Sequence, residues 1–192
     1  MLSSCASANC IHPLSNNAPA YPVELVTTQS IRGESVCLRP IRPEDAEIEQ
    51  AFVRGLTPEA RHFRFFDTIK ELSPTDLRRL ISIDYDRCMA IIAVIGTGED
   101  ETEIGVARYA ADTESEHVCE FAIVIADDWE GSGLAAALME QLITAARARS
   151  FVLMYGDILH YNMRMLRFVD KLGFRLEPHP DEASLYRAVL KL

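Results

Sequence analysis

The stretch from Ile123 to Ala137, IVIADDWEGSGLAAA, contributes most to the predicted fold. In it an apolar run of strand type passes through a turn containing Gly131 and Gly133 into the strongest helix pattern of the chain, over residues 134–149. Glycines at such a turn allow a sharp change of direction and leave the first amides of the helix uncovered. Uncovered amides and the helix dipole favour negative charge, so the turn predicts a phosphate or pyrophosphate site. A tight turn that needs glycine only for steric reasons is the alternative.

Two other phosphate-binding motifs fit poorly. The chain has no G-x-x-x-x-G-K-[ST] motif, which excludes a P-loop. A dinucleotide-binding fingerprint needs three glycines after an early strand, whereas this turn has two and lies two-thirds of the way along the chain.

The patterns on both sides of this stretch predict an α/β fold with one mixed sheet and helices on its faces. Short polar connections join the three central apolar runs, so these are predicted to be antiparallel strands. The predicted elements are, in chain order, a hairpin around Arg32-Gly33, helices over 44–54 and from Pro74, strands over 89–95, 104–110 and 118–125, the helix over 134–149, a strand over 151–158, a helix over 162–172 and a strand over 185–190.

Length and composition indicate one domain with a well-buried core. The chain has 192 residues, of which 48% are hydrophobic and 25% charged. Residues 1–20 are rich in Ser, Ala, Asn and Pro without periodicity, so we expect a flexible tail followed by a domain over 21–192. The N-terminus lacks a basic segment followed by an apolar one, and a cytoplasmic location is therefore expected.

Charge and cysteine spacing narrow the class of partner. Nineteen Lys and Arg against twenty-nine Asp and Glu give a net charge of −10, which disfavours nucleic acid and anionic membranes. No apolar run approaches the roughly 20 residues that span a bilayer. The five cysteines form no C-x-x-C pair and have no histidine at zinc spacing, so no metal site is expected.

Two motifs in the second half of the chain resemble those of the GNAT N-acetyltransferases. The sequence EGSGLA at Glu130–Ala135 is similar to the acetyl-CoA pyrophosphate loop of that family, with pattern [Q/R]-x-x-G-x-[G/A]. The second motif is Asn162 followed by Leu172-Gly173-Phe174, where an Asn opens a helix that ends in a Leu-Gly-Phe turn. The resemblance covers residues 118–174, and the strand order extends it to about 22–192. It implies the GNAT acyl-CoA N-acyltransferase fold, a mostly antiparallel central sheet flanked by helices, and acetyl-CoA as co-substrate.

A narrower resemblance lies upstream of these motifs. Residues 38–45 (LRPIRPED), 61–66 (RHFRFF) and 83–86 (IDYD) resemble the acetyltransferase domain of bacterial Pat-type protein lysine acetyltransferases. This likeness implies a bacterial protein whose acceptor is a lysine side chain.

The GNAT resemblance implies roles for particular residues. The strand before the loop separates from its neighbour, and its backbone at Ile123, Val124 and Ile125 would pair with the pantetheine arm. Asn162 would contact the CoA arm through its side chain, or alternatively would only cap the helix that begins there. The residues expected to hold the pyrophosphate are Glu130, Gly131, Ser132, Gly133, Leu134 and Ala135.

Two positions depart from the family pattern. Glu130 stands where Gln or Arg is usual, and its carboxylate is expected to repel a pyrophosphate by a modest, partly screened amount. Val169 stands where many relatives carry the tyrosine that protonates the departing thiolate. Valine has no proton to give, so another group supplies it or the thiolate leaves unprotonated, which a thiol pKa near 8.5 allows.

An amine must lose a proton before it attacks a thioester, and Glu120 is the predicted base. Its strand neighbours on the same face are Ala122 and Val124, an apolar setting that is expected to raise the pKa of the carboxyl. An exposed Glu or a salt bridge is the alternative, and His117 is the weaker candidate for the base.

The sequence therefore predicts transfer of an acetyl group from acetyl-CoA to a primary amine by direct attack on the thioester. A protein lysine is the preferred acceptor, and a small-molecule amine is the alternative. A CoA-binding sensor without turnover is the hypothesis from a different functional class, since Glu130 and Val169 depart from the pattern. A homodimer is left open.

Overall fold

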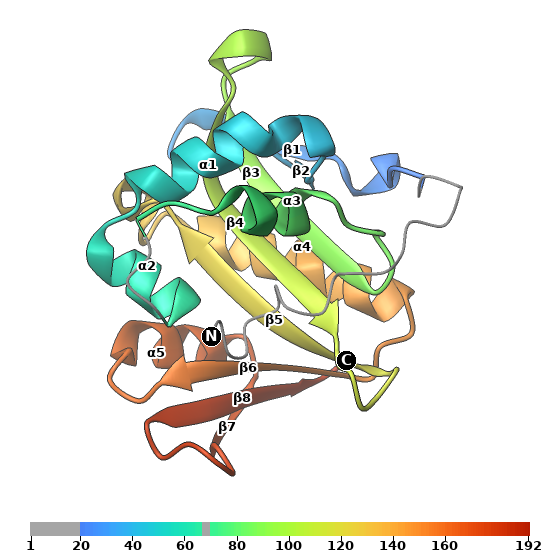
Figure 1. Cartoon of the computed structure of the whole chain (residues 1–192), viewed down its shortest axis with the longest axis vertical. Helices are drawn as coiled ribbons and strands as arrows, with labels where there is room; N and C mark the ends of the chain where they lie inside the picture. The colour runs from blue at the N-terminus through green and yellow to red at the C-terminus, as the bar shows by residue number, and fades with distance from the viewer. Residues whose placement is uncertain (1–19, 67–69) are drawn as a thin grey trace.

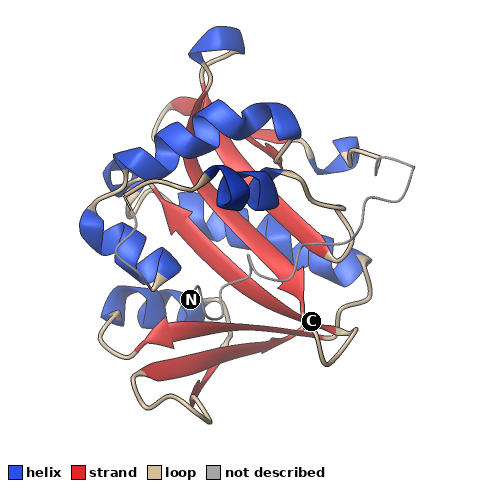
Figure 2. Cartoon of the chain, viewed as in Figure 1, coloured by secondary structure: helices blue, strands red, loops and turns tan. Residues whose placement is uncertain are grey.

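A sheet of eight strands organises the residues that the computed structural model describes, 20–66 and 70–192 (Figures 1 and 2). The tail expected over residues 1–20 lies, except for Ala20, outside the described residues. The strand order is β1-β2-β3-β4-β5-β6-β8-β7. The strands are β1 (Thr27–Ile31), β2 (Glu34–Pro40), β3 (Cys88–Ile95), β4 (Thr102–Ala111), β5 (Val118–Ile125), β6 (Leu153–Leu159), β7 (Arg175–Pro178) and β8 (Leu185–Lys191).

Helices cover both faces of this sheet. The α-helices are α1 (Ala46–Gly55), α2 (Pro58–Phe65), α3 (Pro74–Ile81), α4 (Leu134–Ala148) and α5 (Met163–Lys171). Figure 1 shows α1 and α3 in front of the central strands and α4 behind them. The buried stripe of α4, which includes Leu138 and Leu142, packs on β3, β4 and β5. None of the helices in the described ranges has the length and apolar character needed to cross a bilayer.

The predicted mixed sheet is confirmed. β3, β4 and β5 form the expected antiparallel meander, and β5 pairs in parallel with β6 after the crossover through α4. Helix α3 begins as predicted, with Ser73 Oγ accepting from the Asp76 amide at 3.1 Å and Pro74 in the first turn. The strand β7 was not predicted, because its four residues are too few to show a period.

The pairing of β5 with β6 is unusually short. Only Val118, Cys119 and Glu120 have partners on β6, and the last pair is Glu120 with Tyr155. Beyond this pair the two strands separate, as Figure 1 shows. At the point of separation the ring of Phe121 lies against Gly156, where a Cβ would come within 2.5 Å of the ring. Glycine at position 156 therefore makes room for the side chain that begins the fork.

Candidate active site

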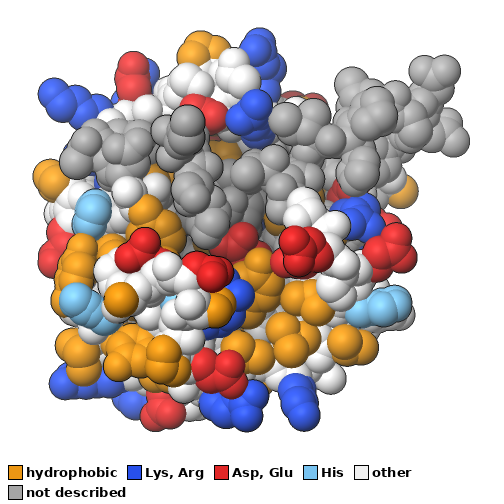
Figure 3. All heavy atoms as spheres, turned by 60° about the horizontal axis from the view of Figure 1, so that its bottom comes forward, with side chains coloured by type: hydrophobic (Ala, Val, Ile, Leu, Met, Phe, Trp, Pro, Cys, Tyr) orange, Lys and Arg blue, Asp and Glu red, His pale blue; other side chains and the backbone are white. Residues whose placement is uncertain are grey.

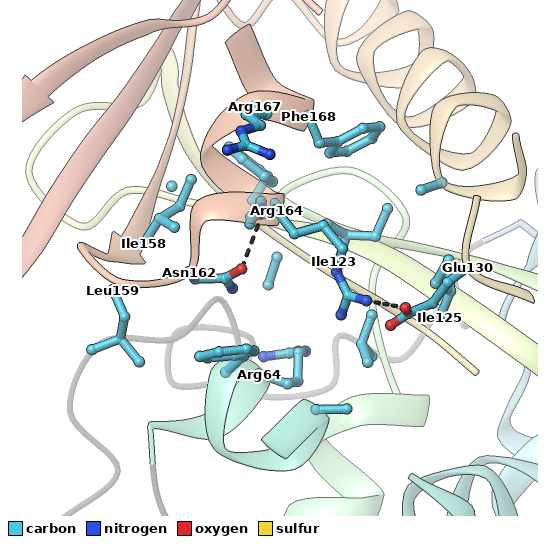
Figure 4. A pocket seen from close by; sticks show the side chains of 18 of the residues that line it. Arg64, Ile123, Ile125, Glu130, Ile158, Leu159, Asn162, Arg164, Arg167 and Phe168 are labelled. Atoms are coloured by element: carbon cyan, nitrogen blue, oxygen red, sulfur yellow. Dashed lines mark hydrogen bonds and ion pairs between the residues drawn. The ribbon is translucent and has the colours of Figure 1, made fainter. Parts of the chain in front are cut away.

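A cavity of about 690 Å³ lies in the fork between β5 and β6. Its walls come from the start of α4, from α2 and from one face of α5 (Figure 4). Each cofactor-binding position expected from the sequence except Ser132 and Leu134 lines this cavity, and so does Glu120. The fold thus brings together residues that are more than forty positions apart in the chain.

The edge of β5 that faces the fork has no neighbouring strand. Ile123, Val124 and Ile125 pair with Ala107, Val106 and Gly105 of β4, but have no partner on β6. Successive residues of a strand direct their N–H and C=O groups to one edge and then to the other, so this edge presents donors and acceptors to the cavity. An extended amide-bearing chain could pair with it as an added strand does.

The turn before α4 carries uncovered amides. In the described part of the chain, the backbone N–H groups of Gly131, Gly133, Ala135 and Ala136 have no hydrogen-bond acceptor. Gly131 and Gly133 have φ angles of +67° and +93°, a left-handed conformation that favours glycine. All four residues line the cavity, so these amides form a suitable site for a pyrophosphate.

Ser132 and Leu134 have a different place in this turn. The Ser132 amide donates to the carbonyl of Trp129 at 3.2 Å, and the Leu134 amide donates to Ser132 Oγ at 3.1 Å. The Leu134 side chain is fully buried in the core. These two residues shape the loop from within, while their neighbours offer the free amides.

Glu130 is not an isolated negative charge at the rim. Its carboxylate forms an ion pair with Arg164, which reaches across the cavity from α5 (Figure 4). Arg167 and Lys171 line the cavity from the same helix. The repulsion expected between Glu130 and a pyrophosphate is thus offset by a neighbouring cation.

Asn162 caps the first turn of α5. Its Oδ1 accepts a hydrogen bond from the Met165 amide at 3.1 Å (Figure 4). The residue also lines the cavity, and its Nδ2 group has no acceptor among the described residues. The helix cap and a contact with a bound chain therefore use different atoms of one side chain.

Glu120 lies at the point where the fork opens. Burial is the largest cause that raises the pKa of its carboxyl, to about 7, and the Asp157 carboxylate adds to this effect. The positive charges of Arg64 and Arg187 act in the opposite direction. A carboxyl with this pKa changes protonation near neutral pH, as a general base requires. The predicted increase in pKa is confirmed, and its causes include charges that the sequence pattern did not indicate.

The second carboxylate in the fork, Asp157, pairs with Arg187 and His179. Arg187 donates two hydrogen bonds to it, each of 2.8 Å, and His179 Nε2 lies 3.2 Å from Oδ2. The Arg187 guanidinium also lies over the Tyr155 ring, 4.6 Å from its centroid. Asp157 is therefore neutralised in place, while the Glu120 carboxyl makes no hydrogen bond or ion pair among the described residues.

Two other positions from the sequence analysis lie away from the chemistry. Val169 is fully buried and does not line the cavity, so its position is part of the core. His117 is exposed ahead of β5 and is also absent from the cavity wall. Among the described lining residues there is no Tyr, Cys, Ser, Thr or His that could protonate a thiolate.

Helix α2 supplies the wall opposite α5. Phe63 and Arg64 of this helix line the cavity, and so does Phe66 directly after it. The centroids of the Phe63 and Tyr161 rings lie 5.8 Å apart. His62 Nε2 lies 2.9 Å from the Tyr161 hydroxyl and joins the same two walls. On the side of the molecule that carries β6, β7 and β8, hydrophobic patches alternate with charged side chains (Figure 3).

Comparisons with known proteins agree on one family. Residues 35–175 match the family model described as an acetyltransferase (GNAT) domain. An acetyltransferase of Pseudomonas aeruginosa is 43% identical over 152 residues, which cover 79% of this chain and 81% of that protein. The acetyltransferase Pat of Mycolicibacterium smegmatis is 26% identical over 148 residues, covering 77% of this chain but only 44% of Pat. The solved GNAT domain of S. lividans PAT has a TM-score of 0.82 and 25% identity, over 90% of this chain and 100% of that domain.

Proposed function

The chain belongs to the GNAT acetyltransferase family, whose members are acyl-CoA-dependent N-acetyltransferases, and we propose that it acetylates the side-chain amine of protein lysines. The observation that carries the proposal is the arrangement of one cavity. Free amides at the start of α4 lie at one end, an unpaired strand edge runs along it, and the Glu120 carboxyl stands where the fork opens.

The proposed chemistry needs one base and a fixed thioester. The pyrophosphate binds the amides of Gly131, Gly133, Ala135 and Ala136, and the pantetheine arm pairs with the free edge of β5. Glu120 takes a proton from the acceptor ammonium, directly or through water, and the neutral amine then attacks the thioester carbonyl. A carbon–nitrogen bond forms, the carbon–sulfur bond breaks, the sulfur keeps the electron pair, and the nitrogen loses its second proton to water to give the neutral amide.

The leaving thiolate departs without a tyrosine in this proposal. Val169 lies in the core, and the described wall of the cavity has no hydroxyl or thiol. A thiol such as that of cysteine has an ordinary pKa near 8.5, so a thiolate is a tolerable leaving group in water. Proton uptake by the thiolate then follows release into solvent.

A lysine acceptor is supported by charge and by likeness to Pat proteins. The net charge of −10 and the Glu120 carboxyl, which makes no ion pair among the described residues, favour the approach of a cationic amine. The structural likeness to the S. lividans PAT domain extends over 90% of this chain. A small-molecule amine remains the second candidate.

An acceptor screen tests the proposal. Purified protein and acetyl-CoA are incubated with a bacterial proteome and with a panel of small amines, and release of free thiol and mass increases are measured. We expect acetylated lysines and acceptor-dependent thiol release. Release with small amines alone would favour the second candidate, and binding of acetyl-CoA without any acceptor-dependent thiol would indicate a sensor.

The pyrophosphate assignment has its own test at Gly133. Acetyl-CoA should raise the Tm of the wild-type protein, since a ligand that binds only the folded state stabilises it. Gly133→Asp places a carboxylate among the free amides, and we expect it to abolish the shift. Gly133→Asn is the matched control, because it places a side chain of the same shape at the same positive φ without the charge. An unchanged shift in folded Gly133→Asp protein would contradict the assignment.

A further inference from the structure

A residue far from the cavity in sequence holds the loop that lines it. Arg32 lies at the turn between β1 and β2, and its guanidinium donates to the backbone carbonyls of Asp128 and Glu130 at 2.6 and 2.5 Å. These carbonyls belong to the segment that leads from β5 into α4. The hairpin is thus tied to the loop by two charge-assisted hydrogen bonds.

The bond to Glu130 has a consequence for the next amide. The Glu130 carbonyl and the Gly131 N–H belong to one trans peptide unit, in which the two groups point in opposite directions. Fixing the carbonyl toward Arg32 therefore fixes the direction of the Gly131 N–H. That amide has no acceptor among the described residues, and Gly131 lines the cavity.

The backbone conformation at Arg32 does not by itself favour an arginine. Arg32 and Gly33 have φ angles of +54° and +86°, so both central residues of this two-residue turn are left-handed. Turns of this kind prefer Asn or Asp before Gly, because other residues are strained there. Arginine is a poor choice for the turn itself, but it alone offers a planar fork for two carbonyls.

We propose that Arg32 is a positioning residue for acetyl-CoA, which orients the Gly131 amide toward the pyrophosphate by holding the Glu130 carbonyl. The inference rests on the proposed binding of the pyrophosphate at this loop. It assigns to the β1–β2 hairpin, at the far edge of the sheet, a part in recognition of the nucleotide half of the substrate.

The test compares two acetyl donors. Acetyl-CoA carries the pyrophosphate, whereas acetyl-pantetheine has the same thioester and arm without it. For Arg32→Asn, we expect KM for acetyl-CoA to rise by about three- to tenfold, the range for loss of one or two hydrogen bonds. Its kcat, and KM for acetyl-pantetheine, should stay within about twofold of the wild-type values. Asn suits the turn, so the variant should retain the wild-type Tm or exceed it.

Two further variants separate geometry from charge. Arg175→Asn removes one exposed positive charge of β7, which pairs only with Glu177 among the described residues, and should change neither KM. Arg32→Lys keeps the charge but cannot form the fork, so its KM for acetyl-CoA should lie between those of wild type and Arg32→Asn. An Arg32→Lys enzyme identical to wild type would show that charge alone acts and would overturn the proposal.

The remaining outcomes are also decisive. Equal increases in KM for both donors in Arg32→Asn would mean that Arg32 supports the cavity in general, and would overturn its role toward the pyrophosphate. Wild-type protein that binds acetyl-CoA no better than acetyl-pantetheine would overturn the proposed pyrophosphate site itself. Failure of the inference is thereby distinguished from failure of the proposed function.

Discussion

Two groups of carboxyls lie on the same face of the sheet. The first is Glu120 with Asp157 at the fork, the second is Glu103 of β4 with Glu49 of α1, and only the first lines the cavity. Glu120 of β5 pairs with Ala110 of β4, two residues beyond Arg108, so the side chains of Glu120 and Arg108 lie on one face. The register of β3 and β4 skips Ile104, and this bulge brings Glu103 to the face of Arg108 as well.

The second group is sealed under α1. Glu49 of this helix lies 3.3 Å from Arg108, and Glu103 is buried beside them. Burial and the neighbouring Glu49 raise the pKa of Glu103 well above its ordinary range. Burial likewise raises the pKa of Glu120, but there the strands separate and the carboxyl faces the cavity. A raised pKa is therefore common to both groups, and access to substrate distinguishes the candidate base.

The largest expected effect concerns these two carboxyls directly. Glu120→Gln should lower kcat by roughly 10²–10⁴-fold, the usual range for a positioned base, with little change in acetyl-CoA affinity. In the wild type, activity is lost toward low pH as Glu120 is protonated near its pKa of about 7. The shape of this acid limb of the pH profile should change in the variant. Steady-state kinetics between pH 5 and 9 on a verified acceptor measure both.

Glu103→Gln is the matched control for this experiment. It makes the same chemical change at a buried carboxyl on the neighbouring strand, and kcat should stay within about twofold of the wild type. Equal losses in the two variants would break the distinction between them. A Glu120→Gln enzyme with near-normal kcat and an unaltered pH profile would transfer the role of base to water.

The next largest effect is on stability at the sealed group. Glu49→Ala removes a carboxylate that pairs with buried Arg108, and removing one member of a buried ion pair costs about 3–5 kcal/mol. For a domain of this length the Tm should fall by about 10 °C. Activity measured well below that Tm should be unchanged. Glu49→Gln, which keeps the shape and a hydrogen-bond acceptor, should lose less, and an equal loss would argue against the charge as the cause.

The pH dependence of stability should show what the two groups share. The pKa of Glu120 in the folded protein, about 7, lies above the ordinary 4.5, so the native state holds a proton that the unfolded chain releases between these values. The stabilising contribution is complete below about pH 4.5 and is lost as the pH rises through 7. Unfolding by denaturant at pH 5 and at pH 8 measures this loss. Between these pH values, the free energy of unfolding of Glu120→Gln should rise by up to about 3 kcal/mol relative to that of the wild type. The free energy of unfolding of Glu103→Gln should change in the same direction. A variant that is stabilised more at pH 5 than at pH 8 would contradict the raised pKa of the residue it replaces.

The smallest expected effect is on acetyl-CoA affinity and concerns Glu130, which is not buried. Glu130 is partly exposed at the rim and paired with Arg164. Glu130→Gln should tighten acetyl-CoA binding by up to roughly 1 kcal/mol, since the change frees Arg164 and removes a screened charge. The gain should shrink with added salt, which titration calorimetry at two ionic strengths can measure. Weaker binding by the variant would mean that the carboxylate itself supports the loop.

The part of the site that could be predicted depends on local sequence. The strand at Val118–Ile125, the glycine turn and α4 are continuous in the chain, so their periods and turn residues indicate both the elements and the site. Glu120 could be proposed because it is a charged residue in an apolar strand. The same signal is present at Asp157 in β6, although the apolar run there predicts only a strand.

The rest of the site depends on contacts between distant segments. Asp157 is held by Arg187 and His179, and these meet it only through pairing of β6 with β8 and the position of the β7–β8 connection. The ion pair of Glu130 with Arg164 joins the starts of two different helices. Such partners are determined by packing between segments on the two sides of the fork. The residue pattern along a single strand or helix carries no information about this packing.

The short pairing of β5 with β6 also has a mechanical consequence. The sheet consists of two plates, β1–β5 and β6–β8–β7, in which adjacent strands share between four and eight residue pairs. Three parallel pairs join the plates, and parallel pairing is the slightly weaker kind. The sheet is therefore expected to deform most easily by rotation of one plate relative to the other about this seam, the three residue pairs between β5 and β6. Glu120 belongs to the last pair of the seam, so the rotation would change the width of the cleft at Ile125 while moving the carboxylate at its axis least.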